Sequence, residues 1–182
     1  MSKIIKELAI KLQKAIANEK IDSAKNILRD SNEETVKQLL NYHNKKINGA
    51  TALLVATVYD NVEIVRCLIE DYKADTSVTN MYEQNLLHLA AKNGANKVLA
   101  YIIKKDGGDL FQSLNVEASD GLTALKLAKA NKQKESIELI ESVKTYEQET
   151  SWISSVFNFF RKKDDYQSLP PDDKRPSTPL MT

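Results

Sequence analysis

The chain has 182 residues, and its 26 basic and 25 acidic side chains leave a formal net charge of +1. Nucleic-acid-binding proteins usually show a basic excess or a basic stripe, so this balance argues against that class. The hydrophobic share of 42% suffices for the core of a globular protein, and a single cysteine excludes an intramolecular disulfide and a cysteine-based zinc site.

The first 45 residues are predicted to be helical. The stretch "KAIANEKIDSAKNILRD" places apolar side chains at helical spacing, and "NEETVKQLLNYHNKK" adds a further helical turn or two. We interpret residues 3–45 as an N-terminal cap built on a degenerate repeat, with a separate helical hairpin as the alternative. The opening residues mix Lys and Glu into the apolar positions, unlike a signal peptide, and no segment reaches the roughly 20 apolar residues of a membrane span. A cytoplasmic location is therefore expected, with signal-less secretion into a host cell left open.

The next stretches repeat one pattern. "NGATALLVATVYDNVEIVRCLIED" begins at Asn48, "EQNLLHLAAKNGANKVLAYIIKKD" at Glu83 and "SDGLTALKLAKANKQKESIELIES" at Ser119. Matching positions lie 34 and then 38 residues apart, a period typical of stacked supersecondary units. Each stretch reads as two short helices, and Gly94 between them suits the left-handed backbone that ends a helix. Such short helices need stacking against their neighbours to be stable.

The repeated pattern resembles the ankyrin repeat, whose consensus runs Gly-x-Thr-Pro-Leu-His-x-Ala-Ala-x-x-Gly and continues into an Ile-Val-x-Leu-Leu helix. The resemblance covers about residues 48–142. The matching residues are Gly49, Thr51, Leu53, Ala56, Ile64, Val65, Leu68 and Ile69; then Leu87, His88, Ala90, Ala91, Gly94, Val98 and Ile102; then Gly121, Thr123, Leu125, Ala128, Ile137, Leu139 and Ile140.

The sequence departs from this consensus at several positions. Ala52, Leu86 and Ala124 replace the proline, Asp60 and Lys132 replace the inter-helix glycine, and Lys73 replaces the glycine of the connector that precedes a finger. The resemblance implies an all-α ankyrin-repeat solenoid of stacked helix-turn-helix units with short finger hairpins and a helical N-terminal cap. The predicted segments are 1–45 (cap or degenerate repeat), 46–80 (repeat), 81–118 (repeat with a loop insertion), 119–145 (capping repeat), 146–163 (amphipathic helix) and 164–182 (disordered tail).

Two segments do not fit the repeat. "KKDGGDLFQSLNVEASDG" contains the four extra residues of the longer period, and we expect Leu110, Phe111 and Leu114 to fold back as a loop with its own apolar contacts. The segment at 151–163 would place apolar side chains on one side of a helix and a basic run after it. It could cap the last repeat, lie on a membrane surface or dock on a partner. The residues concerned are Trp152, Ile153, Val156, Phe157, Phe159, Phe160, Arg161, Lys162 and Lys163.

Catalytic equipment is scarce in this sequence. His88 matches the histidine of the repeat, which by resemblance hydrogen-bonds backbone near the finger, and His43 lies in a polar segment where exposure is expected. No zinc-binding His-Glu-x-x-His motif, phosphate-binding glycine loop or Gly-x-Ser-x-Gly motif is present. We therefore expect a non-enzymatic protein without metal or cofactor.

The resemblance implies binding of another protein on a concave surface formed by finger tips and first helices. We expect a monomer that binds one unidentified protein and no nucleic acid; the alternative is a membrane-associated adaptor or a host-directed bacterial effector anchored by 151–163. The Lys-, Asn- and Ile-rich composition resembles ankyrin proteins of AT-rich intracellular bacteria. The positions expected to contact the partner are Ile47, Asn48, Tyr59, Met81, Tyr82, Gln84, Lys92, Asn93, Ser119, Asp120, Leu122 and Asn131.

Overall fold

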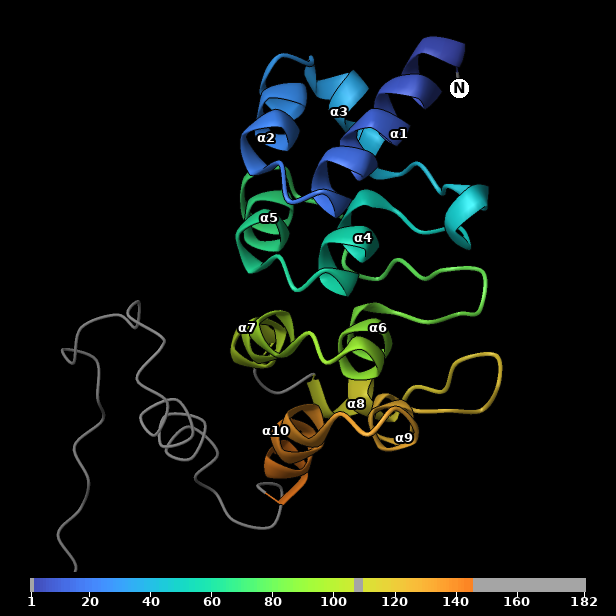
Figure 1. Ribbon diagram of the computed structural model, residues 1–182, viewed down its shortest axis with the longest axis vertical. Helices are drawn as coiled ribbons and strands as arrows, with labels where there is room; N and C mark the ends of the chain where they lie inside the picture. Colours follow the sequence, from blue (N-terminus) through green and yellow to red (C-terminus); the bar gives the residue numbers. More distant parts are fainter. Residues whose placement is uncertain (1, 107–109, 146–182) are drawn as a thin grey trace, which may run out of the picture.

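The computed structural model describes residues 2–106 and 110–145, and it consists of helical hairpins stacked side by side (Figure 1). The paired helices are α1 (Lys3–Ala17) with α2 (Ile21–Arg29), α4 (Ala52–Val58) with α5 (Val62–Arg66), α6 (Leu86–Asn93) with α7 (Asn96–Asp106), and α9 (Ala124–Ala130) with α10 (Lys134–Thr145). The first helices of the pairs form one layer and the second helices form the other. A 3₁₀ turn at Lys45–Ile47 precedes α4, and a π turn at Cys67–Asp71 extends α5.

Each hairpin from the second onward begins at a polar cap. The side chains of Thr51, Asn85 and Thr123 accept hydrogen bonds from the backbone N–H groups three residues ahead, at 3.4, 3.0 and 3.4 Å. These bonds satisfy backbone donors that the first helical turn leaves unpaired. The cap positions are those from which the repeat period was counted, so the sequence register and the structural register agree.

Small side chains allow the hairpins to approach closely. Six alanines of the first helices α4, α6 and α9 are completely buried between neighbouring units: Ala52, Ala56, Ala90, Ala91, Ala124 and Ala128. Larger apolar residues fill the space between the layers, and one continuous core runs from Ala9 in α1 to Ile140 in α10. The all-α solenoid of stacked helix-turn-helix units expected from the sequence is confirmed.

An additional helix, α3 (Glu33–Leu40), follows the first hairpin and packs on α1 and α4. It accounts for the surplus residues of the N-terminal segment. Its buried side chains Val36, Leu39 and Leu40 join the common core, so this part of the chain is continuous with the stack. The exact segment boundaries predicted above stay predictions.

The insertion after α7 is where the sequence-based expectation was wrong. Instead of a loop, residues Leu110–Asn115 form a helix, α8, which packs against α9 and α10. Leu114 is fully buried, and burial of this one side chain holds the turn of helix against the neighbouring unit. The segments at 146–163 and 164–182 lie outside the described residues.

Candidate partner-binding face

Three short fingers project from the N-terminal ends of α4, α6 and α9 on one side of the stack (Figure 1). Each finger is closed across its base by a backbone hydrogen bond. The bonds run from Asn44 N to Ala50 O (3.1 Å), from Asn80 N to Gln84 O (3.0 Å) and from Ala118 N to Leu122 O (3.1 Å). The fingers thus stand as similar turns along the same edge of the molecule.

Backbone bonds also join successive finger tips. Met81 N donates to Asn48 O at 2.8 Å, and both the backbone N and the hydroxyl of Ser119 donate to Tyr82 O, at 3.0 and 2.9 Å. A Cβ atom on Gly49 would lie only 2.8 Å from Cγ of Met81, and Gly49 has a φ of +72°. Glycine at this position therefore meets both a backbone requirement and a close approach. The finger tips form one connected surface rather than separate loops.

Large apolar side chains are exposed on this surface. The exposed fraction is 66% for Met81, 51% for Tyr82 and 40% for Ile47. Tyr59, at the C-terminal end of α4, is 49% exposed. Since the finger tips are hydrogen-bonded to each other, Ile47, Met81 and Tyr82 lie on adjacent turns; we call these three residues the finger-tip ridge.

Gln84 must be removed from the expected contact residues. Its side chain is 4% exposed, and its Oε1 accepts a 3.0 Å hydrogen bond from Nδ2 of Asn80. The Asn80 side chain in turn accepts from the backbone N–H groups of Tyr82 and Gln84. Gln84 therefore stabilises the second finger from inside. Its position in the repeat predicted that Gln84 faces outward. The repeat pattern does not reveal which side chain of a finger turns inward.

The remaining expected contact residues are at least partly accessible. Asn48, Asn93, Ser119, Asp120 and Asn131 are exposed, and Lys92 and Leu122 are half-buried. Several also stabilise their own element: the amides of Asn93 and Asn131 donate to the carbonyls of Leu89 and Leu127, and the Asp120 carboxylate accepts from Leu122 N. Trp152, Ile153, Val156, Phe157, Phe159, Phe160, Arg161, Lys162 and Lys163 lie outside the described residues.

Two exposed apolar residues, Ile4 and Val116, were not singled out from the sequence. Val116, directly after α8, is 46% exposed. It belongs to the insertion, where the repeat consensus gives no guide to which side chains face solvent. A Val among polar neighbours carried no signal that could have singled it out.

His88 is fully buried and has a structural role. Its Nε2 donates to the carbonyls of Val116 and Leu122, at 3.0 and 3.2 Å, and its Nδ1 accepts from Asn85 N at 3.3 Å. Burial lowers the pKa of His88, although the two carbonyls act in the opposite direction. The neutral ring thus links α6 to the base of the third finger. The exposed ring of His43 bonds the carbonyl of Gly49 through Nδ1, at 2.9 Å.

The described residues show little that resembles a catalytic centre. Burial, with a smaller effect of Asp71, raises the pKa of the Cys67 thiol to about 11, so this thiol is protonated and weakly nucleophilic near pH 7. Within residues 2–106 and 110–145, no group of three or more His, Cys, Asp or Glu side chains could hold a metal ion. In the same part of the chain, no helix is both long and apolar enough to cross a membrane.

Comparison with known proteins identifies the repeats. A family model described as ankyrin repeats, three copies, matches residues 12–113. Alpha-latroinsectotoxin-Lt1a of Latrodectus tredecimguttatus is 29% identical over 116 residues, which are 64% of this chain and 7% of the toxin. Alpha-latrocrustotoxin-Lt1a of the same species is 33% identical over 85 residues, 47% of this chain and 6% of the toxin. The chain thus spans less than a tenth of the length of the curated relatives that it matches.

Proposed function

Because this chain belongs to the ankyrin-repeat family, whose members generally bind other proteins and are generally not enzymes, we propose that it binds a partner protein across its finger tips and first helices. The observation that supports this proposal is the finger-tip ridge. Its Met and Tyr side chains are of types enriched in the centres of protein interfaces. An interface of standard size buries roughly 800 Å² on each partner, an area that a row of connected fingers can supply.

Tyr82 is the expected centre of the interface. It is half exposed although its backbone carbonyl is fixed by two hydrogen bonds from Ser119, so its main chain needs little ordering when a partner binds. Met81 lies beside it and is the more exposed of the two. Tyr59 adds a second aromatic side chain from the first-helix layer. The polar residues Asn93, Asn131, Ser119 and Asp120 would form the rim of such an interface.

The experiment begins with affinity purification of a partner and then measures its Kd for variants. Replacing Met81 and Tyr82 together by Ala should weaken binding by about 30-fold, the equivalent of one interface hot spot of about 2 kcal/mol. The melting temperature should change little, because both side chains are largely exposed. Ile4→Ala is the matched control, since Ile4 is 75% exposed but belongs to α1 and not to a finger. Equal loss of binding in both variants, or in neither, would contradict the assignment.

A membrane-associated adaptor is the alternative, and the aromatic and basic segment at 151–163 supports it. In this role the segment would bind a membrane surface, while the repeats recruit a partner; delivery into a host cell would be one setting for such a protein. Flotation of the intact chain with anionic liposomes, compared with a chain ending at Thr150, tests the idea. Equal flotation of the two chains would eliminate it.

A further inference from the structure

The row of fingers carries charges of opposite sign at its two ends. Between its two closing residues, the first finger contains Lys45 and Lys46 and no acidic residue. The second finger contains Glu83 and the third contains Asp120, and neither has a basic residue between its closing residues. All four charged side chains are exposed. A partner that lies along the fingers therefore meets positive charge at one end and negative charge at the other.

These four charges are not neutralised by neighbouring side chains. Within the described part of the chain, none of them takes part in an ion pair; Lys126 and Glu117, at the base of the third finger, pair with each other at 3.4 Å. The Asp120 carboxylate accepts only a backbone hydrogen bond, from Leu122 N at 3.0 Å. Its charge thus remains available to a partner, like those of the two finger lysines.

The large apolar side chains of the finger-tip ridge lie between these charges. Lys46 directly precedes Ile47, which is the ridge residue of the first finger. Asp120 directly follows Ser119, whose backbone N donates to Tyr82 O at 3.0 Å. Because the tips are hydrogen-bonded in sequence, the ridge has a basic end at the first finger and an acidic end at the third.

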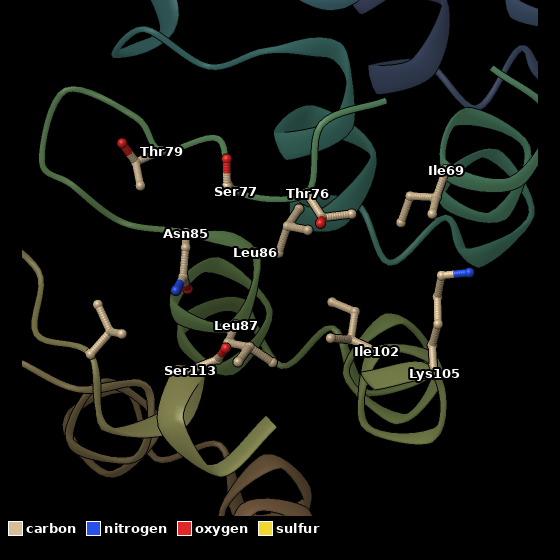
Figure 2. A pocket seen from close by; sticks show the side chains of 11 residues that line it. Ile69, Thr76, Ser77, Thr79, Asn85, Leu86, Leu87, Ile102, Lys105 and Ser113 are labelled. Carbon is tan, nitrogen blue, oxygen red and sulfur yellow. The ribbon is translucent and has the colours of Figure 1, made fainter. Parts of the chain in front are cut away.

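The groove beside the second finger lacks this arrangement (Figure 2). It has a volume of about 370 Å³ and apolar lining residues that include Leu86 and Ile102. Among the described residues that line it, only Lys105 is charged. A site with one charge does not fix the direction of a partner. Lys105 is exposed, as the finger lysines are, and so offers a control for a charge outside the fingers.

We propose that the finger tips select a partner segment in which a large apolar side chain stands between acidic residues on one side and basic residues on the other. The acidic side faces the first finger, and the basic side faces the second and third. This inference rests on the proposed function and adds the chemistry and the direction of the partner. Apolar residues in the centre of an interface supply most of its affinity, whereas complementary charges speed association and disfavour wrong partners.

Three synthetic peptides are the probes. Each has Leu-Phe-Leu at its centre and two charged residues at each end: one peptide is acidic at one end and basic at the other, one is acidic at both ends and one is basic at both ends. Titration into isotope-labelled full-length protein should shift the amide signals of Met81, Tyr82 and Ser119. The peptide with opposite ends should bind about tenfold more tightly than the other two, and about 1 M salt should remove most of this difference.

Reversing the charge at one end of the row should change which peptide binds best. Lys45→Glu combined with Lys46→Glu should favour the peptide with two basic ends. Glu83→Lys combined with Asp120→Asn should favour the peptide with two acidic ends; the Asn side chain keeps an acceptor for the third finger. Lys105→Glu, at the groove, should leave the order of preference as in the wild type.

Glu83→Gly separates binding from folding. Glu83 has a φ of 57° at the position where the other two fingers have Gly49 and Gly121, both with a φ of 72°. Glycine should therefore relieve backbone strain and raise the midpoint of urea unfolding, while loss of the carboxylate weakens the peptide with opposite ends by about threefold. A variant that gains stability and keeps the full affinity would show that Glu83 does not contact the peptide.

Equal affinities of the wild type for the three peptides, no binding of any of them at millimolar concentration, or a preference that the finger variants leave unchanged would overturn the proposal. The variant with Met81→Ala and Tyr82→Ala tests the proposed function separately. If it binds the peptides as the wild type does, the finger tips are not the binding face. If it loses binding while the wild type does not distinguish the peptides, the face is correct and only the order of charges is rejected.

Discussion

At the scale of single residues, the turn of each hairpin requires a left-handed backbone whether or not glycine is present. Gly94 has a φ of 67°, and the equivalent residues Glu19, Asp60 and Lys132 have values of 55°, 51° and 58°. In this conformation, the Cβ atom of an ordinary residue lies too close to the following carbonyl oxygen, at a cost of roughly 1–2 kcal/mol. The repeat geometry thus outweighs the local preference of three of these four residues.

Replacing Lys132 by Gly should stabilise the protein by about 1 kcal/mol. The left-handed backbone is strained for Lys132, which is exposed, and is not strained for glycine. The midpoint of urea unfolding should rise. The reverse change, Gly94→Ala, should lower it, since alanine is strained at this positive φ. A lower midpoint for Lys132→Gly would mean that this hairpin does not turn as the others do.

His88 makes the stability of the fold depend on pH. Its pKa is lowered in the folded protein by burial, and the neutral ring uses Nδ1 as an acceptor for Asn85 N. Protonation would place a charge in the core and would take this acceptor from Asn85 N, while the new Nδ1–H could donate to Oδ1 of Asn85, 2.7 Å away. Since the folded pKa lies below the unfolded value of about 6.5, the contribution is complete above pH 6.5 and is lost as the pH falls from there through the folded pKa.

Chemical unfolding at a series of pH values should therefore show stability falling below pH 6.5, by at most about 1.4 kcal/mol per pH unit from this group. His88→Asn should be less stable at pH 7.5 and should lose this part of the slope. His43→Gln should keep it, because the His43 side chain is exposed. A wild-type slope that survives in His88→Asn would assign the effect to other groups.

At the scale of helices, the sequence was sufficient to predict those helices whose apolar spacing and caps are local in the chain. The apolar spacing and polar caps of α4, α6 and α9 predicted these helices and their register, because the same residues both form the helix and face the neighbouring unit. Burial that depends on another segment was not predictable. Leu114 becomes helical only against α9 and α10, and Gln84 turns inward only because Asn80 lies opposite it.

Asp60 also stabilises the start of a neighbouring helix, a role that its position in the repeat did not predict. Standing where the consensus has glycine, it accepts hydrogen bonds from the backbone N–H groups of Val98 (2.8 Å) and Lys97 (3.3 Å), at the start of α7. Burial raises the pKa of Asp60, while these two bonds oppose the rise. The turn of one hairpin therefore caps the second helix of the next.

Removing this cap with Asp60→Ala should destabilise the protein by about 1 kcal/mol, the usual cost of losing an N-terminal helix cap. Asp60→Asn should restore most of the loss, because its amide oxygen can still accept from Val98 N and Asn tolerates the left-handed backbone. Thermal unfolding of the three proteins provides the comparison. If Asn and Ala prove equally destabilising, the carboxylate charge rather than the hydrogen bond is responsible.

At the scale of the whole molecule, each hairpin depends on its neighbours. First helices pack on first helices from α1 to α9, and α7 packs between α5 and α10, so the apolar face of one unit is completed by the next. Polar side chains reinforce the junction of the first hairpin with the first finger. Gln13 is buried in α1, donates to the carbonyls of Tyr42 and Ala50 at 3.3 and 3.0 Å, and accepts from Nδ2 of Asn44 at 2.8 Å.

Gln13→Leu should therefore loosen one end of the stack rather than the whole molecule. The substitution keeps the side-chain size but leaves Asn44 Nδ2 and the carbonyl of Tyr42 without this partner, at a cost of about 1–3 kcal/mol. Native-state hydrogen exchange should accelerate in α1, α2 and α3 and should change little in α6, α7 and α9, because a stack of repeats can open from one end. Gln38→Leu is the matched control, since the Gln38 amide bonds Glu34 within its own helix, and exchange should stay as in the wild type. Uniform acceleration across all helices in Gln13→Leu would instead show that the hairpins unfold as a single cooperative unit.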